Sequence, residues 1–161
     1  MNTRIMKPSK NIAFVVNDNK KSDLIEWSYF NKELLIPHEI IATGAAGNIL
    51  EGTLNKKINK LLSGPLGGYG QLAEMVTDGR IDAVIFFGTS GEAQLRTNEL
   101  DNLIETALVN NIIVAGNRTT ADFVLTSFLM NKNYAVETVE PTDQPKTELT
   151  ATKKFAAVTI E

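Results

Sequence analysis

Short apolar runs alternate along the chain with segments that have helical spacing. Apolar runs that end in polar residues or glycine predict buried strands, and they cover residues 11–16, 38–44, 81–87 and 111–117. Apolar residues three and four positions apart predict helices over residues 22–30, 48–62, 71–77, 98–110 and 120–130. Strands and helices in alternation indicate the α/β class, with a doubly wound parallel sheet covered on both faces to give three layers.

Polar or glycine-containing loops follow the predicted strands. Doubly wound folds bind ligands at the carboxyl ends of their strands. The loops therefore supply candidate ligand contacts, which are Asn17, Asp18, Thr43, Gly44, Thr89 and Arg118. That these loops converge in space is an expectation from the fold class.

The stretch LSGPLGGYGQ, residues 62–71, holds four glycines close to Ser63 and Tyr69. The backbone N–H groups of such a loop can hold an anion. The same glycines also suit a tight turn with no ligand, so the residues alone leave both interpretations open.

Composition removes several classes of function. The 161 residues suit one domain, and a net charge of -3 argues against a nucleic-acid partner, which usually meets a basic face. The absence of cysteine excludes disulfides and thiol catalysis, and a single histidine, His38, excludes a multi-histidine metal site. We expect neither a metal nor a cofactor. Apolar runs are too short to span a bilayer and no signal peptide is visible, which predicts a cytoplasmic protein.

Several conspicuous side chains are expected to be structural. His38 precedes a predicted strand, and Trp27 and Phe30 lie one helical turn apart, as core residues do. The lysines of the helix predicted over residues 48–62 are expected to form a solvated face; they are Lys56, Lys57 and Lys60. Asp122 is expected in the first turn of its helix, where the helix dipole favours a carboxylate.

The regular pattern stops at Pro141. We therefore predict a domain over residues 1–141. Residues 142–161 form an extension that is expected to pack on the domain or on a neighbouring subunit.

Five segments occur together in an order and spacing that mark a family: KNIAFVVNDNKK, IIATGAAGN, LLSGPLGGYGQ, GRIDAVIFF and NRTTADFVL. Over residues 10–141 the chain resembles the methylglyoxal synthases. The resemblance implies a small doubly wound fold, shared with the regulatory domain of carbamoyl-phosphate synthetase, and a homo-oligomer, most often a hexamer. It also implies the conversion of dihydroxyacetone phosphate into methylglyoxal and phosphate, begun by a carboxylate that removes a proton beside the carbonyl.

Position by position, the chain keeps the family's scaffold and loses its catalytic groups. Matching residues include Asp18, Lys21, Thr43, Gly44, Ser63, Gly64 and Gly68. The family's base is an aspartate, and Tyr69 stands in its place. Asn17 replaces a histidine, Thr89 stands at or near a second aspartate, and a further histidine aligns around Arg96.

The lost groups argue against the family's reaction. General acid–base catalysis contributes about 10² to 10⁴-fold per group, and a tyrosine with a reference pKa of about 10 supplies little phenolate at neutral pH. Asp18 is the one retained carboxylate. We therefore expect no catalytic residue in the pocket.

Changes around the phosphate loop point to a different ligand. The family's TGxTG loop, whose threonine hydroxyls contact phosphate, here reads TGAAG with Ala45 and Ala46, which weakens the hold on a small phosphate. Arg96 and Arg118 can pair with phosphate in a bidentate way, and the ring of Tyr69 can support a base or ribose. The pattern favours a larger anion, such as a nucleotide.

We therefore expect a non-catalytic protein that sequesters a phosphorylated or nucleotide-derived small molecule. Phages use such sponges against host defences that signal through cyclic nucleotides or ADP-ribose derivatives. Two alternatives stay open: a working methylglyoxal synthase, and a regulatory module that senses a metabolite.

Overall fold

A five-stranded parallel sheet forms the centre of the computed structural model, which describes residues 2–88 and 98–138. The strand order is β4-β3-β2-β5-β6, and all neighbouring strands run parallel. The strands are β2 (Asn11–Val16), β3 (Glu39–Thr43), β4 (Asn59–Leu61), β5 (Ala83–Phe87) and β6 (Ile113–Ala115). This arrangement confirms the predicted doubly wound α/β class.

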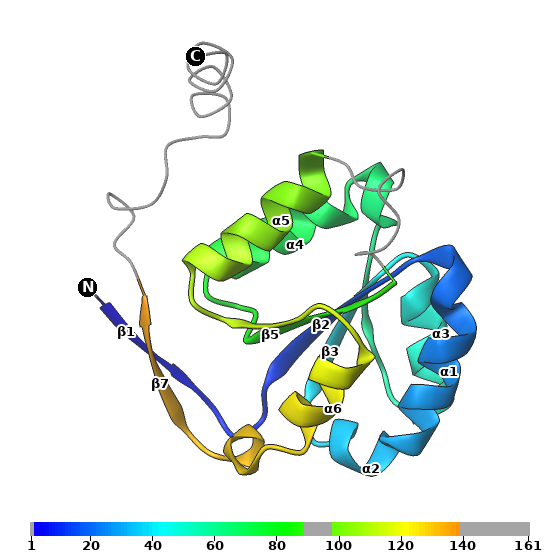
Figure 1. The fold of residues 1–161 in the computed structure, drawn as a ribbon, viewed down its shortest axis with the longest axis horizontal. Coiled ribbons are helices and arrows are strands. Elements are labelled where there is room, and N and C mark those ends of the chain that lie inside the picture. The colour runs from blue at the N-terminus through cyan, green and yellow to red at the C-terminus, as the bar shows by residue number, and fades with distance from the viewer. Residues whose placement is uncertain (1, 89–97, 139–161) are drawn as a thin grey trace.

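Helices cover both faces of the sheet (Figure 1). On one face lie α1 (Lys21–Phe30), α3 (Ala45–Leu54) and α6 (Arg118–Leu125), with the short α2 (Lys32–Leu35) after α1. On the other face lie α4 (Gly68–Thr77) and α5 (Asn98–Val109). The central strands are mainly apolar because each of their faces meets a layer of helices.

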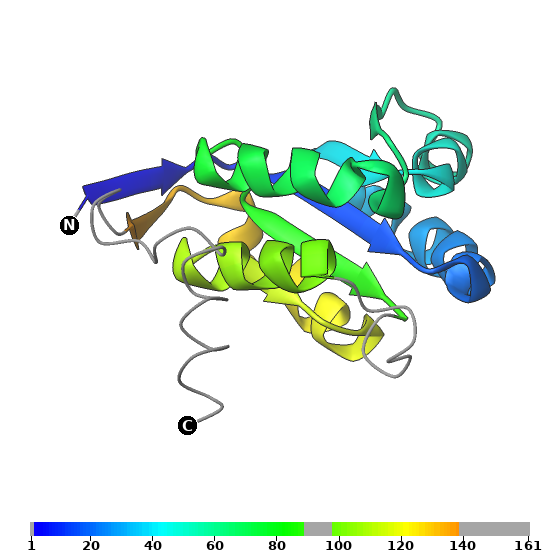
Figure 2. The same cartoon turned by 90° about the horizontal axis from the view of Figure 1, so that it is seen from above.

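A two-stranded antiparallel ribbon extends the domain at the amino ends of the parallel strands. It pairs β1 (Asn2–Met6) with β7 (Tyr134–Thr138). Figure 2 shows β2 and β5 pointing to one end of the molecule and the ribbon at the opposite end. The ribbon is joined to the sheet by Met6 and Val136, which are buried in the core under α4 and α5, and by an ion pair of 2.8 Å between Arg4 and Asp82.

The helix predicted over residues 48–62 is wrong in its second half. Helix α3 ends at Leu54, and Asn55 adopts a left-handed conformation with φ 51°, which is a common way to close a helix. The chain then returns as the edge strand β4. The predicted lysine face is therefore wrong as well: Lys60 lies on this strand and pairs with Glu51 at 2.7 Å, and Lys56 donates to the carbonyl of Ile36 at 2.9 Å.

Helix α6 begins two residues earlier than predicted and ends at Leu125, before a 3-10 turn, η4 (Phe128–Asn131). Asp122 therefore lies in the second turn of the helix and not in its first. Its carboxylate accepts a hydrogen bond of 2.7 Å from the indole N–H of Trp27. Trp27 is buried in the core, as predicted, whereas Phe30 is 85% exposed, so its predicted core role is wrong.

His38 lies at the amino end of β3, away from the loops expected to bind a ligand. Its Nδ1 accepts a hydrogen bond of 2.9 Å from the backbone N–H of Lys10. Burial, and then the charges of Lys10 and Lys56, lower the pKa of the imidazole. A neutral, buried acceptor agrees with the structural role expected for this residue.

Within residues 2–88 and 98–138, no helix is long and apolar enough to cross a bilayer. The predicted extension, residues 142–161, lies outside the described residues.

Candidate functional site

The loops after β3 and β4 touch each other at the carboxyl edge of the sheet. Gly44 has φ 57°, and a Cβ placed on it would lie 3.3 Å from the Cα and Cβ of Ser63. The N–H of Gly44 donates to the carbonyls of Leu61 at 3.3 Å and Leu62 at 3.2 Å. Only glycine combines this backbone conformation with so close a contact, so Gly44 holds the two loops together.

The glycine-rich loop folds into a 3-10 turn, η2 (Gly64–Leu66), that leads directly into α4. The carbonyl of Ser63 accepts hydrogen bonds from the N–H groups of Leu66 at 3.0 Å and Gly68 at 2.8 Å. A Cβ on Gly68 would lie 2.9 Å from the carbonyl oxygen of Ser63. The geometry of the turn therefore explains by itself why residue 68 is a glycine. Because α4 starts at Gly68, it is longer than the helix predicted over residues 71–77.

Tyr69 lies in the first turn of α4 and is only 6% exposed. Its ring belongs to the core under α4 and α5 and lies against Gly64: a Cβ on Gly64 would overlap the ring and approach its hydroxyl oxygen to 2.7 Å. The ring face that was expected to support a base or ribose is covered. The aromatic surface of Tyr69 is therefore not accessible to a ligand.

The environment of Tyr69 keeps its hydroxyl neutral. Burial raises the pKa of Tyr69, and the negative charge of Asp18 raises it further. Since an unperturbed tyrosine has a pKa of about 10, the group is protonated at neutral pH. It can donate a hydrogen bond to an anion, but it cannot accept a proton as a base.

The loop after β2 contributes Asn17, Asp18 and Lys21. Asn17 is buried and joins this loop to the end of β5, with its side-chain amide donating to the carbonyl of Gly88 and its backbone N–H donating to Phe87 at 3.1 Å. The Asp18 carboxylate is 96% exposed and lies 3.4 Å from the ammonium of Lys21. Asn17 thus has a structural task, whereas Asp18 and Lys21 are accessible to a ligand.

Thr43 and the start of α3 complete the carboxyl edge. Thr43 is buried at the end of β3, and α3 begins two residues later at Ala45 without a side-chain cap on its first N–H groups. These N–H groups have no carbonyl four residues earlier within the helix. The start of α3 therefore presents backbone donors and the positive end of the helix dipole at the carboxyl edge of the sheet.

Arg118 is paired with a residue of another helix. It begins α6 and forms an ion pair of 3.1 Å with Glu26 on α1. Its strand, β6, is two places from β2 in the sheet, which corresponds to about 10 Å. The structure thus brings together Gly44, Ser63, Gly64, Tyr69 and Asp18, whereas the guanidinium of Arg118 is engaged by Glu26. Thr89 and Arg96 lie outside the described residues.

Sequence reasoning missed Lys20. A Cβ on Gly88, which has φ 85°, would overlap the Lys20 stem and lie 3.2 Å from its Cβ and Cδ. The Lys20 stem therefore covers the end of β5, and its ammonium lies 3.7 Å from Asp23. The available signal was the glycine directly after the most apolar strand, because such a glycine often marks a close approach by another part of the chain.

Fold and loops together define a small doubly wound α/β domain whose glycine-rich turns meet at the carboxyl ends of the strands. Residues 23–116 match the MGS-like domain family, and the chain belongs to that family. It is 43% identical over 129 residues to the methylglyoxal synthase of Coxiella burnetii (strain RSA 493 / Nine Mile phase I), covering 80% of this chain and 90% of the relative.

Two further comparisons agree. The methylglyoxal synthase of Photorhabdus laumondii is 34% identical over 137 residues, with 85% of this chain and 90% of the relative covered. The crystal structure of methylglyoxal synthase from Elizabethkingia anophelis NUHP1 superposes with a TM-score of 0.79 at 34% identity, covering 91% of this chain and 100% of that chain. The fold and the family are therefore those that the sequence resemblance implied.

The described residues supply anion donors more readily than catalysts. Backbone N–H groups at the start of α3, the Lys21 ammonium and the neutral hydroxyl of Tyr69 all favour a negative ligand. In the part of the chain that the structure describes, no three His, Asp or Glu side chains are placed to hold a metal ion.

Proposed function

We propose that the protein binds a phosphorylated or nucleotide-derived small molecule at the carboxyl ends of its strands and holds it without turnover. The observation that carries this proposal is Tyr69. It occupies the position that the family resemblance gives to the catalytic base, and its burial and its neighbour Asp18 raise its pKa. A hydroxyl that stays protonated cannot remove the proton with which the family's reaction begins.

The remaining carboxylate is a poor substitute for the missing base. Asp18 is 96% exposed and pairs with Lys21 at 3.4 Å, whereas a general base must be positioned within hydrogen-bond reach of the proton that it removes. By contrast, the contact of Gly44 with Ser63 and the uncapped start of α3 keep the anion-binding side of the scaffold in place. Together these groups support the binding of an anion without a catalysed reaction.

A protein that sequesters its ligand binds one molecule per site and releases it unchanged. Calorimetry of the full chain with ADP-ribose, a cyclic dinucleotide and inorganic phosphate tests this. We expect at least one of these anions to bind more tightly than about 1 mM, which is roughly 4 kcal/mol, with a stoichiometry of one per subunit. Lys21→Met is expected to weaken the binding, and Lys32→Met, remote from the loops, is the matched control. No binding by any of the three, or equal binding by both variants, contradicts the proposal.

A working methylglyoxal synthase is the second candidate, because the relatives of Coxiella burnetii and Photorhabdus laumondii carry that name and Asp18 is retained. The two candidates differ in one assay, the formation of methylglyoxal from dihydroxyacetone phosphate. The first predicts no product above the buffer blank, and Tyr69→Asp restores little because Asn17 stands at the position of a family histidine. Turnover by the natural chain that disappears in Asp18→Asn establishes the enzyme instead.

We also propose that the chain assembles into a homo-oligomer, with a hexamer expected from the family resemblance. Three phenylalanines support an interface because water covers most of their surface in the single chain: Phe30 is 85%, Phe123 75% and Phe128 73% exposed. Light scattering at micromolar concentration tests the assembly. A monomer there contradicts it.

A further inference from the structure

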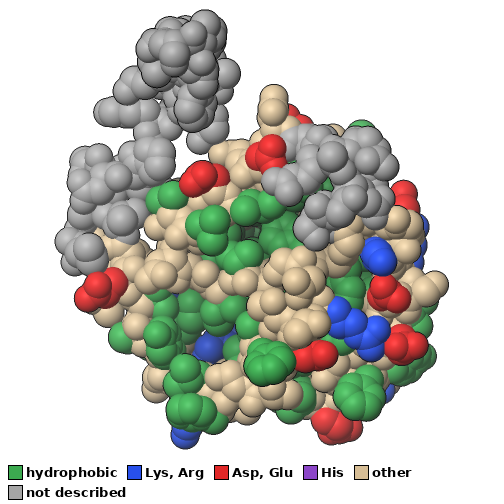
Figure 3. Space-filling view, in the orientation of Figure 1, with side chains coloured by type: hydrophobic (Ala, Val, Ile, Leu, Met, Phe, Trp, Pro, Cys, Tyr) green, Lys and Arg blue, Asp and Glu red, His purple; other side chains and the backbone are tan. Residues whose placement is uncertain are grey.

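A hollow of about 330 Å³ lies at the end of the sheet opposite the candidate site. It opens between the ribbon of β1 and β7, the start of β6, and the segment from α6 into η4. Its walls are mostly apolar and include Met6, Ile112, Val124, Leu129, Met130 and Val136. Figure 3 views this side of the molecule, where hydrophobic side chains gather around a recess in which a basic side chain is visible.

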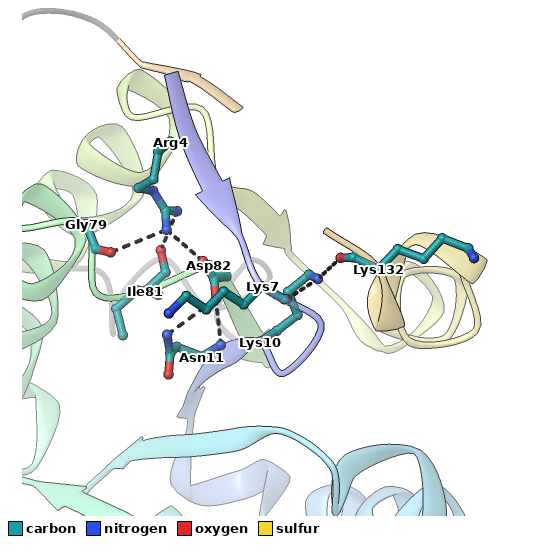
Figure 4. A network of polar contacts seen from close by, with 8 residues as sticks. All are labelled: Arg4, Lys7, Lys10, Asn11, Gly79, Ile81, Asp82 and Lys132. Carbon is teal, nitrogen blue, oxygen red and sulfur yellow. Dashed lines mark hydrogen bonds and ion pairs between the residues drawn. The ribbon is translucent and has the colours of Figure 1, made fainter. Parts of the chain in front are cut away.

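Lys10 is the charged residue of this hollow, and it is 1% exposed. Its ammonium donates to the backbone carbonyls of Lys7 and Lys132, the latter at 2.7 Å (Figure 4). An ammonium carries three N–H groups, so one of them has no acceptor among the described residues. Burial lowers the pKa of Lys10, which reflects the cost of keeping this charge away from water.

The nearest carboxylate is already engaged elsewhere. Asp82 accepts from Arg4 at 2.8 Å and from the backbone N–H of Asn11 at 2.7 Å (Figure 4). It moderates the pKa shift of Lys10 without a direct hydrogen bond to it in the part of the chain described. The charge of Lys10 is thus held by neutral carbonyls, and an anion in the hollow would be its first direct ionic partner.

A second donor lies in the same hollow. The hydroxyl oxygen of Ser127 accepts from the N–H of Leu129 at 3.1 Å, which leaves its O–H free to donate. A carboxylate has two oxygens that accept such bonds, and charge-assisted bonds of this kind are about twice as strong as neutral ones. The apolar walls suit a hydrocarbon chain attached to that carboxylate.

We propose that this hollow is a second ligand site, which takes a small aliphatic carboxylate with its head group at Lys10 and Ser127 and its chain against the apolar walls. The volume is near the lower limit of small-molecule sites, about 300 to 1,000 Å³. It equals about eleven waters at roughly 30 Å³ each, which suits a ligand of about ten non-hydrogen atoms. The site is independent of the candidate site because it lies at the amino ends of the strands.

Octanoate is the probe, and its neutral amide and acetate are the comparison ligands. In calorimetry on the full chain we expect octanoate to bind with a dissociation constant below about 1 mM. Octanamide lacks the charge and acetate lacks the chain, so each is expected to bind at least about tenfold more weakly. Octanamide binding as tightly as octanoate, or no octanoate binding at millimolar concentration, overturns the proposal.

Two matched variants locate the site. Leu129→Trp fills the hollow from a residue that is 38% exposed, and Leu108→Trp adds the same bulk at a residue of α5 that is 58% exposed and does not line it. We expect the first to weaken octanoate binding at least about tenfold and the second to leave it unchanged. Equal binding by the two variants contradicts the assignment. Lys10→Met should remove the preference for octanoate over octanamide; if this variant does not fold, the comparison of the two ligands on the natural chain decides the role of the charge.

Discussion

Gly64→Ala tests the packing of the Tyr69 ring against the glycine-rich turn. The new Cβ would overlap the ring and lie 2.7 Å from its hydroxyl oxygen. Overpacking of this kind costs about 1 to 3 kcal/mol. Gly64 does not have a positive φ, so alanine fits its backbone and the cost comes from the ring alone.

Thermal unfolding of the full chain gives the magnitude. For a domain of this size, 1 kcal/mol corresponds to about 2–4 °C in Tm, so Gly64→Ala should lower Tm by about 2–12 °C. Gly70→Ala is the control, because it lies in the same helix and its Cβ would meet nothing within 4 Å. That substitution should leave the protein equally stable or stabilise it by up to about 1 kcal/mol, as alanine does in helices.

A double-mutant cycle assigns the cost to the ring. In a Tyr69→Ala background, Gly64→Ala should change the free energy of unfolding by less than about 0.5 kcal/mol, because its partner is gone. The reasoning is refuted if Gly64→Ala costs the same with and without the ring, or if Gly64→Ala and Gly70→Ala have the same Tm.

Three further predictions concern titration and the core. Tyr69 should ionise above the usual tyrosine pKa of about 10. The stability that its neutral hydroxyl contributes to the folded state is complete below about pH 10 and is lost as the pH rises further. In an ultraviolet titration of tyrosine ionisation, Tyr69→Phe should lack the transition at the highest pH. His38 has a lowered pKa, so the stability that its neutral imidazole contributes should be complete above about pH 6.5 and fall at lower pH. An NMR titration of this single imidazole measures its pKa. The stability of His38→Gln should lack this pH dependence. Asp122→Ala leaves the indole N–H of Trp27 without its acceptor, and should cost about 1 to 3 kcal/mol in denaturant unfolding. Glu105→Ala, at an exposed position of α5, is the surface control, and a cost equal to the control contradicts this role.

The sequence predicts the central strand β2 correctly but assigns the edge strand β4 to a helix, for a physical reason. From Ile12 onward β2 is apolar because both of its faces are covered, and its bounds, Asn11–Val16, are those predicted. Residues 55–62 continue an apolar spacing that also suits a helix, but the left-handed Asn55 ends α3 and Ile58 reaches the core from a non-helical segment. Periodicity cannot distinguish these cases, because both put apolar residues into the same core.

The ribbon was not predicted because it has little local signal. In β1 only Met6 is buried, and the strand also pairs through Arg4 with Asp82, which is distant in sequence. In the candidate site, too, some features were predictable from the sequence and others were not. The loops at strand ends were predictable from topology, whereas the burial of Tyr69 depends on Gly64 across a turn, and the direction of Arg118 depends on Glu26 in another helix.

The two ends of the sheet offer anions different kinds of partner. At the carboxyl end, α3 and α4 begin, and their first N–H groups attract negative charge without a buried cation. At the amino end, α5 and α6 finish, and their dipoles oppose an anion. A ligand there needs a full positive charge to offset them, and Lys10 supplies it from within the protein. Because the two sites use separate residues, saturating inorganic phosphate should leave the affinity for octanoate unchanged in calorimetry, and direct competition between the two would mean that both anions bind in one place.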